Sequence, residues 1–348
     1  MQDRGLYLLG LHLNREDWCT LAAERIAQNL HLSVFADGSH WEQSPLYHCE
    51  VLQCVLDVLW AAKQNSRTLP AEIGEKAHAM CRALRIWLKP NGHLLLQSDS
   101  DDVDARDLLV SGALLFQDAA LCPEGISTLC AENLWDLGPE QQTAYSALLS
   151  SAQPLRSSRM LPDSGNCMLR GGKDSYVHMH CGCLGSGHGH ADLLHVDAGI
   201  AGEDVLIDSG RYTYVNTPLR RELKSPAAHN TTRVDDLDFS TCLDSWGYSA
   251  LAIPVKGEHC FTDSADYVSG AHLGYLKQGL LPMRKLVFLK ELNDLLLFDQ
   301  LFGEGKHTFE QNFHFGEGEV TLEGSTLTVQ RTAEHFNWFV TALHLMPD

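Results

Sequence analysis

Residues 187–192 read Gly-His-Gly-His-Ala-Asp, and this stretch decides how the rest of the chain is interpreted. The two histidines stand two residues apart, among small residues and just before an apolar alternation over residues 193–198. Because successive side chains of a strand point to opposite faces, residues two apart share one face. The stretch therefore predicts a β-strand that presents two imidazoles to one point.

Two later stretches add a carboxylate and a third histidine. Apolar residues 205–207 predict a strand that ends at Asp208, and His229 enters a further predicted strand. His190, Asp208 and His229 together offer two imidazole nitrogens and one carboxylate oxygen, a set that zinc accepts with room for water or another ligand. We expect a metal-stiffened sheet beside an active site. The alternative is a chance pair, since the chain holds 18 histidines.

These stretches resemble the heparinase II/III-like polysaccharide lyases, which include some alginate lyases. Residues 187–192, Ile-Asp-Ser-Gly-Arg-Tyr-Thr-Tyr at 207–214 and Ala-His-Asn-Thr at 228–231 resemble the family's C-terminal sheet domain. Residues 37–48, Asp-Gly-Ser-His-Trp-Glu-Gln-Ser-Pro-Leu-Tyr-His, resemble the signature of its helical domain. The motifs stand in the family's order, and the resemblance runs from residue 5 to at least residue 240.

The resemblance implies roles for single residues. Tyr47 matches the family's general acid or base, His188 its catalytic histidine, and Tyr214 a second tyrosine of the alginate-lyase members. The residues that match the ligands of a structural zinc ion are His190, Asp208 and His229. From helical spacing alone, Tyr47 would instead be a core aromatic residue.

The reaction that the resemblance implies is β-elimination on an acidic polysaccharide that contains uronic acid. The proton at C5 becomes removable when the neighbouring carboxylate is neutralised and a positioned base is present. The residues expected to contact the substrate are Glu42, Arg211, Arg221 and Lys224. The basic residues cluster between positions 211 and 233 beside the expected metal site, and a solvated loop is the alternative reading of that cluster.

Two other functions compete with a lyase. The family's carboxylate-neutralising asparagine or histidine would fall before Met1, so we expect either a fragment that lacks its true N-terminus or a carbohydrate-binding or polysaccharide-assembly protein without full lyase power. A cupin-like metal oxygenase would need a glutamate four residues after the second histidine, where Leu194 stands.

Two patterns of hydrophobic residues predict an α+β protein with two domains. Apolar residues recur at helical spacing over residues 18–30, 51–59 and 73–87, Ser44-Pro45 marks a helix start, and residues 99–102 are expected to cap a further helix. After a Ser/Pro/Arg linker at 154–164 the period becomes two. We expect part of an α/α toroid of antiparallel helices over residues 1–153 and an antiparallel β-sandwich over residues 154–348.

The composition of the chain limits which binding partners and which cellular compartments are expected. A net charge of −19 disfavours nucleic acid and anionic membranes, and no apolar run is long enough to span a bilayer. The eleven cysteines follow no disulfide spacing, which favours a reducing compartment. The first residues lack a signal peptide, so we expect a periplasmic or secreted protein if upstream chain is missing and a cytoplasmic one otherwise. The oligomeric state stays open.

Overall fold

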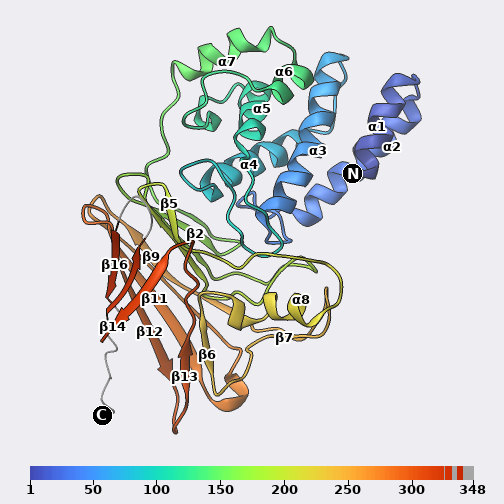
Figure 1. The fold of residues 1–348 in the computed structure, drawn as a ribbon. Helices are drawn as coiled ribbons and strands as arrows, with labels where there is room; N and C mark the ends of the chain where they lie inside the picture. The colour runs from blue at the N-terminus through green and yellow to red at the C-terminus, as the bar shows by residue number, and fades with distance from the viewer. Residues whose placement is uncertain (325, 331–334, 340–348) are drawn as a thin grey trace.

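The chain folds into a helical half followed by a sheet half (Figure 1). The computed structural model describes residues 1–324, 326–330 and 335–339. The helices of the first half are α1 (Gln2–His12), α2 (Glu16–Ser33), α3 (Pro45–Gln64), α4 (Ala71–Trp87), α5 (Arg106–Phe116), α6 (Ala131–Leu137) and α7 (Gln141–Leu149), with a 3₁₀ turn η1 (Ala119–Leu121). The predicted mixture of helices and antiparallel strands is confirmed.

Apolar stripes explain how these helices pack. In α3 the side chains of Leu52, Val55 and Leu56 are buried, and in α4 those of Ile73 and Met80. These side chains belong to one hydrophobic core that α1, α2 and α5 also enter. Helices α1 and α2, joined by a short turn, lie side by side at one end of this half (Figure 1).

The helix start predicted at Ser44-Pro45 is confirmed, but the serine hydroxyl has another task. Pro45 occupies the first turn of α3, and the backbone carbonyl of Ser44 accepts the first helical hydrogen bond from His48 N–H. The Ser44 hydroxyl makes no cap bond and instead donates to the backbone carbonyl of Asp99, 2.8 Å away. The start of α3 is thereby tied to the segment between α4 and α5.

The helix cap expected at residues 99–102 is wrong. Helix α5 begins at Arg106, with Ala105 at its N-cap position, and residues 99–102 are irregular. Asp99 is fully buried and bonds to side chains of the sheet half instead. The carboxylate of Asp99 pairs with Arg220 of the sheet half and is therefore not available to cap a helix.

The first sheet has five antiparallel strands in sequence order: β1 (Arg159–Leu161), β2 (Asn166–Arg170), β3 (Tyr176–His180), β4 (Val196–Ile200) and β5 (Glu203–Leu206). The prediction that His188 and His190 lie on a strand is wrong, because both lie in the loop between β3 and β4. A turn with Leu194 at φ 64° precedes β4 and delays its start to Val196. Close packing also shapes this loop, since a Cβ on Gly189 would lie 1.8 Å from the carbonyl oxygen of Leu184.

The second sheet has the strand order β12-β11-β10-β9, all antiparallel. Its strands are β9 (Pro254–Phe261), β10 (Ala265–His272), β11 (Leu281–Leu289) and β12 (Asp294–Phe302). Val268, Leu286 and Phe288 from this sheet share one buried cluster with Leu169 and Val196 from the first sheet. Burial of these facing side chains packs the two sheets together.

Shorter elements complete the sheet half. They are α8 (Pro218–Leu223), the 3₁₀ turns η2 (Pro226–Ala228) and η3 (Leu276–Gln278), and the strands β6 (Thr232–Val234), β7 (Thr241–Cys242), β8 (Tyr248–Ala250), β13 (Phe309–Gln311), β14 (Glu319–Glu323), β15 (Thr326–Gln330) and β16 (His335–Phe339). Strands β14 and β15 pair antiparallel with each other. Residues 340–348 of the expected sheet domain lie outside the described residues.

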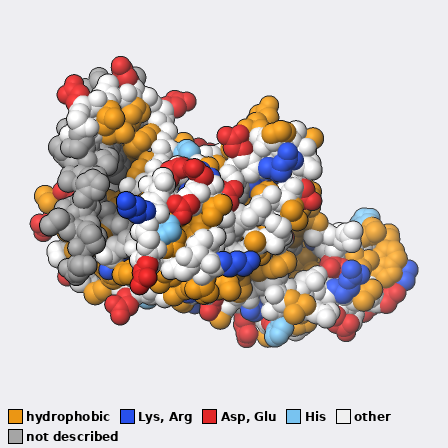
Figure 2. Space-filling view, turned by 90° about the horizontal axis from the view of Figure 1, so that it is seen from below, with side chains coloured by type: hydrophobic (Ala, Val, Ile, Leu, Met, Phe, Trp, Pro, Cys, Tyr) orange, Lys and Arg blue, Asp and Glu red, His pale blue; other side chains and the backbone are white. Residues whose placement is uncertain are grey.

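The described part of the surface shows no large region of one charge sign on the face in Figure 2. Acidic, basic and hydrophobic side chains are interspersed on the face seen from the sheet side (Figure 2). Among the described helices, none combines the length and hydropathy needed to cross a membrane. The eleven cysteines, all within the described ranges, are free thiols.

Two aspartates join the halves away from the core. Asp37, before α3, accepts hydrogen bonds from the backbone N–H groups of Asp163 and Ser164 at 2.8 and 2.9 Å. Asp163 in turn accepts one from Asp37 N–H at 2.9 Å. Asp37 also accepts from Ser39 N–H at 3.0 Å, so its carboxylate carries more bonds than that of Asp163.

We therefore expect Asp37→Ala to destabilise the protein more than Asp163→Ala. Loss of charge-assisted bonds to three backbone N–H groups should lower the free energy of unfolding by about 2–4 kcal/mol, against about 1 kcal/mol for the single bond lost in Asp163→Ala. Urea unfolding followed by circular dichroism measures both. Equal urea midpoints for the two variants would contradict this account.

Candidate functional site

A buried ion cluster lies where the helical half meets the sheet half. Asp99 forms a two-pronged ion pair with Arg220 of α8, in which Nη2 lies 2.7 Å from Oδ2 and Nη1 contacts Oδ1. Nδ1 of His188 lies 3.2 Å from Oδ2 of Asp99, and Nε2 of His190 lies 3.0 Å from Oδ1. Burial alone would raise the pKa of Asp99, but hydrogen bonds from His188, His190 and Arg220 outweigh it and hold that pKa well below its usual range.

The three predicted catalytic residues meet beside this cluster. The ring of Tyr47, in the first turn of α3, stacks on His188 with centroids 3.6 Å apart and planes 23° apart. The hydroxyls of Tyr47 and Tyr214 lie 2.8 Å apart. Burial, followed by the hydrogen bond with Tyr47, raises the pKa of Tyr214, so its hydroxyl holds a proton at neutral pH. The arrangement brings together two phenols and one imidazole, which are group types that general acid–base catalysis uses.

The segment that carries Tyr214 differs from what its spacing predicts. Tyr212 and Tyr214 stand two residues apart after Asp208, a spacing that predicts a strand with both side chains on one side, but residues 207–217 are irregular. Asp208 accepts a hydrogen bond from Gly210 N–H, and Gly210 has φ 59°, so the chain turns away from β5. Tyr212 consequently projects into solvent with 77% of its surface exposed, while Tyr214 points inward.

Two residues of the site were missed from the sequence, Asp99 and Trp246. Trp246 stacks on Tyr214 at 5.1 Å and meets the ring of His188 edge-on at 5.4 Å, while 48% of its surface is exposed. Asp244 positions it by accepting its backbone N–H at 2.8 Å. For Trp246, the available sequence signal was an aromatic residue within an Asp-Ser-Trp-Gly turn. For Asp99, the sequence shows only a polar stretch, which does not predict a buried ion pair.

A cavity of about 650 Å³ opens from Tyr47 and His188 towards α1 and α2. Its size lies within the roughly 300–1,000 Å³ typical of ligand sites. Trp41 and Glu42 line it next to Tyr47 and His188, and burial raises the pKa of Glu42. Apolar side chains of α2 and α3, among them Leu30 and Val51, form much of its wall.

The predicted basic contacts are not equally placed. Arg211 pairs with Asp101 and lies over the Tyr214 ring at 5.0 Å, so it stands at the site. The guanidinium of Arg221 donates to Asn216 at 2.6 Å. Lys224 is fully buried and donates to the backbone carbonyls of Gly187 and Ser245 at 2.7 and 3.2 Å.

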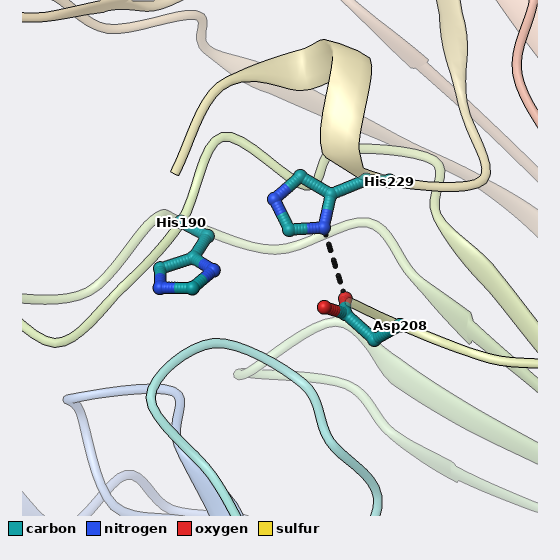
Figure 3. A group of neighbouring side chains, drawn as sticks. All are labelled: His190, Asp208 and His229. Atoms are coloured by element: carbon teal, nitrogen blue, oxygen red, sulfur yellow. Dashed lines mark hydrogen bonds and ion pairs between the residues drawn. The ribbon is translucent and has the colours of Figure 1, made fainter. Parts of the chain in front are cut away.

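The predicted metal-ligand set does come together. Ligand atoms of His190, Asp208 and His229 lie within 4.8 Å of one another, and all three side chains are buried (Figure 3). Nδ1 of His190 and Nε2 of His229 have no hydrogen-bond partner, which leaves one ring nitrogen of each free to bind a metal. The other nitrogen of each ring lies 3.0 Å from a carboxylate, of Asp99 for His190 and of Asp208 for His229, as metal-bound histidines generally require.

Two models of known protein families match the chain. The heparinase II/III-like C-terminal model matches residues 153–344, and the heparinase II/III N-terminus model matches residues 8–119. No curated protein matches the chain.

Solved structures share the fold. A heparinase III aligns with a TM-score of 0.76 at 16% identity, covering 94% of this chain and 49% of its own. The heparan sulfate lyase HepC from Pedobacter heparinus aligns with a TM-score of 0.74 at 16% identity, covering 95% of this chain and 50% of its own. The chain thus spans about half the length of these structures.

Lys224 should make stability depend on pH. Burial, followed by the nearby charge of Arg220, lowers its pKa to about 8, below the roughly 10.4 of free lysine. Between these values the unfolded chain binds more protons, so the free energy of unfolding should rise with pH by up to about 3 kcal/mol on this account. Urea unfolding at pH 8 and pH 10 measures it.

In Lys224→Met, the part of the pH-dependent rise in unfolding free energy that Lys224 contributes should be missing. Replacement of the exposed Lys306 by methionine (Lys306→Met) should leave that rise unchanged. The same change in stability from pH 8 to pH 10 in Lys224→Met and wild type would show that Lys224 keeps its charge in the folded state.

Proposed function

Since the chain belongs to the heparinase II/III-like family, we propose that it is a polysaccharide lyase that cleaves a uronic-acid-containing acidic polysaccharide by β-elimination. The observation that best supports this proposal is the joined set of Tyr47, Tyr214 and His188 at one end of the large cavity. A hydrogen-bonded phenol pair beside an imidazole supplies both a proton acceptor and a proton donor within reach of one bound sugar.

The proposed reaction needs three tasks. One group removes the C5 proton, another protonates the departing 4-O oxygen, and a positive or hydrogen-donating group neutralises the carboxylate at C5. Tyr47, Tyr214 and His188 share the two proton transfers, and the division between them depends on the epimer that is cleaved. Asp99 holds the His188 ring in place through its contact with Nδ1 of that ring.

Three residues are proposed to contact the substrate. We assign the carboxylate to Arg211, which lies over Tyr214, and further contacts to Glu42, which lines the large cavity, and to Arg221 of α8. Lys224 supports the loop of His188 through the Gly187 carbonyl. The half-exposed rings of Trp41 and Trp246 offer flat apolar faces for sugar rings.

We further propose that His190, Asp208 and His229 hold a structural zinc ion. Their nitrogen and oxygen atoms suit zinc, and the two partnerless ring nitrogens favour a cation there. When bound, zinc would supply a fixed link between the loop of His188, the segment that leads to Tyr214 and the residues after η2. His190 belongs to the same loop as His188, so this link would preserve the catalytic arrangement.

The finer architecture belongs to the same proposal. We take residues 1–153 as a helical domain that forms part of an α/α toroid, and residues 154–348 as a β-sandwich domain. A sugar-binding or polysaccharide-assembly protein with this fold and without turnover is the second candidate, favoured by the exposed Trp41 and Trp246 beside the cavity. A direct assay of elimination separates the two.

We expect Tyr47→Phe to abolish elimination while the protein stays folded. Loss of one proton-transferring hydroxyl should lower kcat by roughly 10²–10⁴-fold. Ultraviolet absorbance of the unsaturated uronate, recorded over a panel of acidic polysaccharides, measures this. Tyr212→Phe is the matched control, because its ring is exposed, and it should keep wild-type turnover.

Silence of the wild type on every polysaccharide would favour the binding protein. Turnover retained in Tyr47→Phe would remove this tyrosine from the mechanism.

We expect His229→Ala to lower zinc content and thermal stability together. His229 contacts Asp208 but has no bond to Asp99, so the variant tests the metal site apart from the ion cluster. Loss of the ion should reduce Tm by roughly 5–10 °C. Elemental analysis and calorimetry measure both quantities, with replacement of the exposed His12 of α1 by alanine (His12→Ala) as control. Unchanged zinc in His229→Ala would refute the assignment.

A further inference from the structure

A second, smaller cavity lies at another part of the junction between the halves. It measures about 70 Å³ and is lined by the end of α4, the turn at 123–124, residues 154–156 and the hairpin between β2 and β3. None of its lining residues lines the large cavity at Tyr47. Its basic lining residues, in a chain with a net charge of −19, are Arg85, Lys89, Arg106, Arg156 and Arg170.

The charges around this cavity are not balanced. Three of the basic side chains have acidic partners, in the ion pairs Arg85–Glu124, Lys89–Asp102, Lys89–Asp204 and Arg106–Asp104. Arg156 and Arg170 form no ion pair with any residue in the described ranges. The remaining acidic group at the cavity, Asp174, is exposed.

Arg170 is unusual because it is buried without a carboxylate. Only 7% of its surface is exposed, and its Nη2 donates to the backbone carbonyls of Ile86 and Leu88 at 3.1 and 2.8 Å. Buried arginines are ordinarily paired with an acid. Burial, followed by the charge of Arg85, lowers the pKa of Arg170 to about 10 and outweighs the nearby charge of Glu124, which raises it.

Polar atoms around Arg170 also lack partners. The Nε atoms of Arg170 and Arg85 are buried with no hydrogen-bond partner, and so is the hydroxyl of Ser175, a residue with 1% of its surface exposed. All three residues line the cavity. A buried donor left without an acceptor costs about 1–3 kcal/mol, so the site is incomplete as protein alone.

We propose that this cavity binds one small oxyanion, phosphate or sulfate, between Arg170 and Arg156, with the Ser175 hydroxyl as a further donor. The planar guanidinium fork matches two oxygens of such an ion. A volume of about 70 Å³ is far below the roughly 300 Å³ of the smallest usual ligand pockets, so a free oxyanion or the sulfate group of a sugar would fit inside, but a sugar ring would not. The bound ion would join the 154–156 segment to the β2–β3 hairpin beside the end of α4.

Calorimetric titration of the whole chain with inorganic phosphate at constant ionic strength tests the proposal, with inorganic sulfate and a sulfated disaccharide as separate arms. Wild type should bind one phosphate or sulfate ion per chain. Arg156→Gln should bind about tenfold more weakly, since it loses one charge-assisted contact. Ser175→Ala, which keeps every charge, should also bind more weakly. Arg159→Gln, an equal change of charge at a residue outside the cavity, should bind as wild type does.

Because Arg156 is exposed, its replacement should leave folding intact, so a weaker affinity would report on binding alone. If the sulfated disaccharide binds and Arg156→Gln weakens this binding, the proposed site stands and its natural oxyanion is the sulfate group of a sugar. Absence of binding in all arms, or equal affinity of wild type and Arg156→Gln, would overturn the proposal. None of these results depends on whether the chain is a lyase.

Discussion

The ion pair between Asp99 and Arg220 is the interaction on which the rest of the site depends. Both side chains are completely buried, and they come from opposite halves of the chain. Removing one partner of a buried ion pair leaves the other charge uncompensated, which costs about 3–5 kcal/mol, so Asp99 and Arg220 hold each other in place. Asp99 therefore fixes the junction in one arrangement, and the two histidines that contact it are fixed with it.

The backbone around Asp99 extends the same constraint to Tyr47 and His188, which we propose to be catalytic. Its carbonyl accepts the hydroxyl of Ser44, which places the start of α3 and hence Tyr47, and its N–H donates to the carbonyl of His188. Tyr47 and His188 then stack face to face. A short irregular segment thus positions residues that are far apart in the sequence, without a regular strand beneath either of them.

Much of the fold and the chemical identity of the site could be predicted from the sequence. The Ser44-Pro45 helix start and the change of period near residue 154 depend only on neighbouring residues, so they can be predicted without knowledge of the tertiary structure. The set of His190, Asp208 and His229 was also found, because ligand types are visible in a sequence. The strand expected for His188 and His190 was wrong, since period-two spacing also occurs in a loop held by glycine and ion pairs.

The sequence by itself determined which chemical groups are present, where α3 begins and that antiparallel strands follow the helices. Only the tertiary structure decided that Asp99 is a buried ionic partner and not a helix cap, that Trp246 reaches Tyr214, and that Tyr212 faces away. The physical reason is that helix starts and strand periods arise from neighbouring residues, whereas the environment of a buried charge is set by residues distant in the chain.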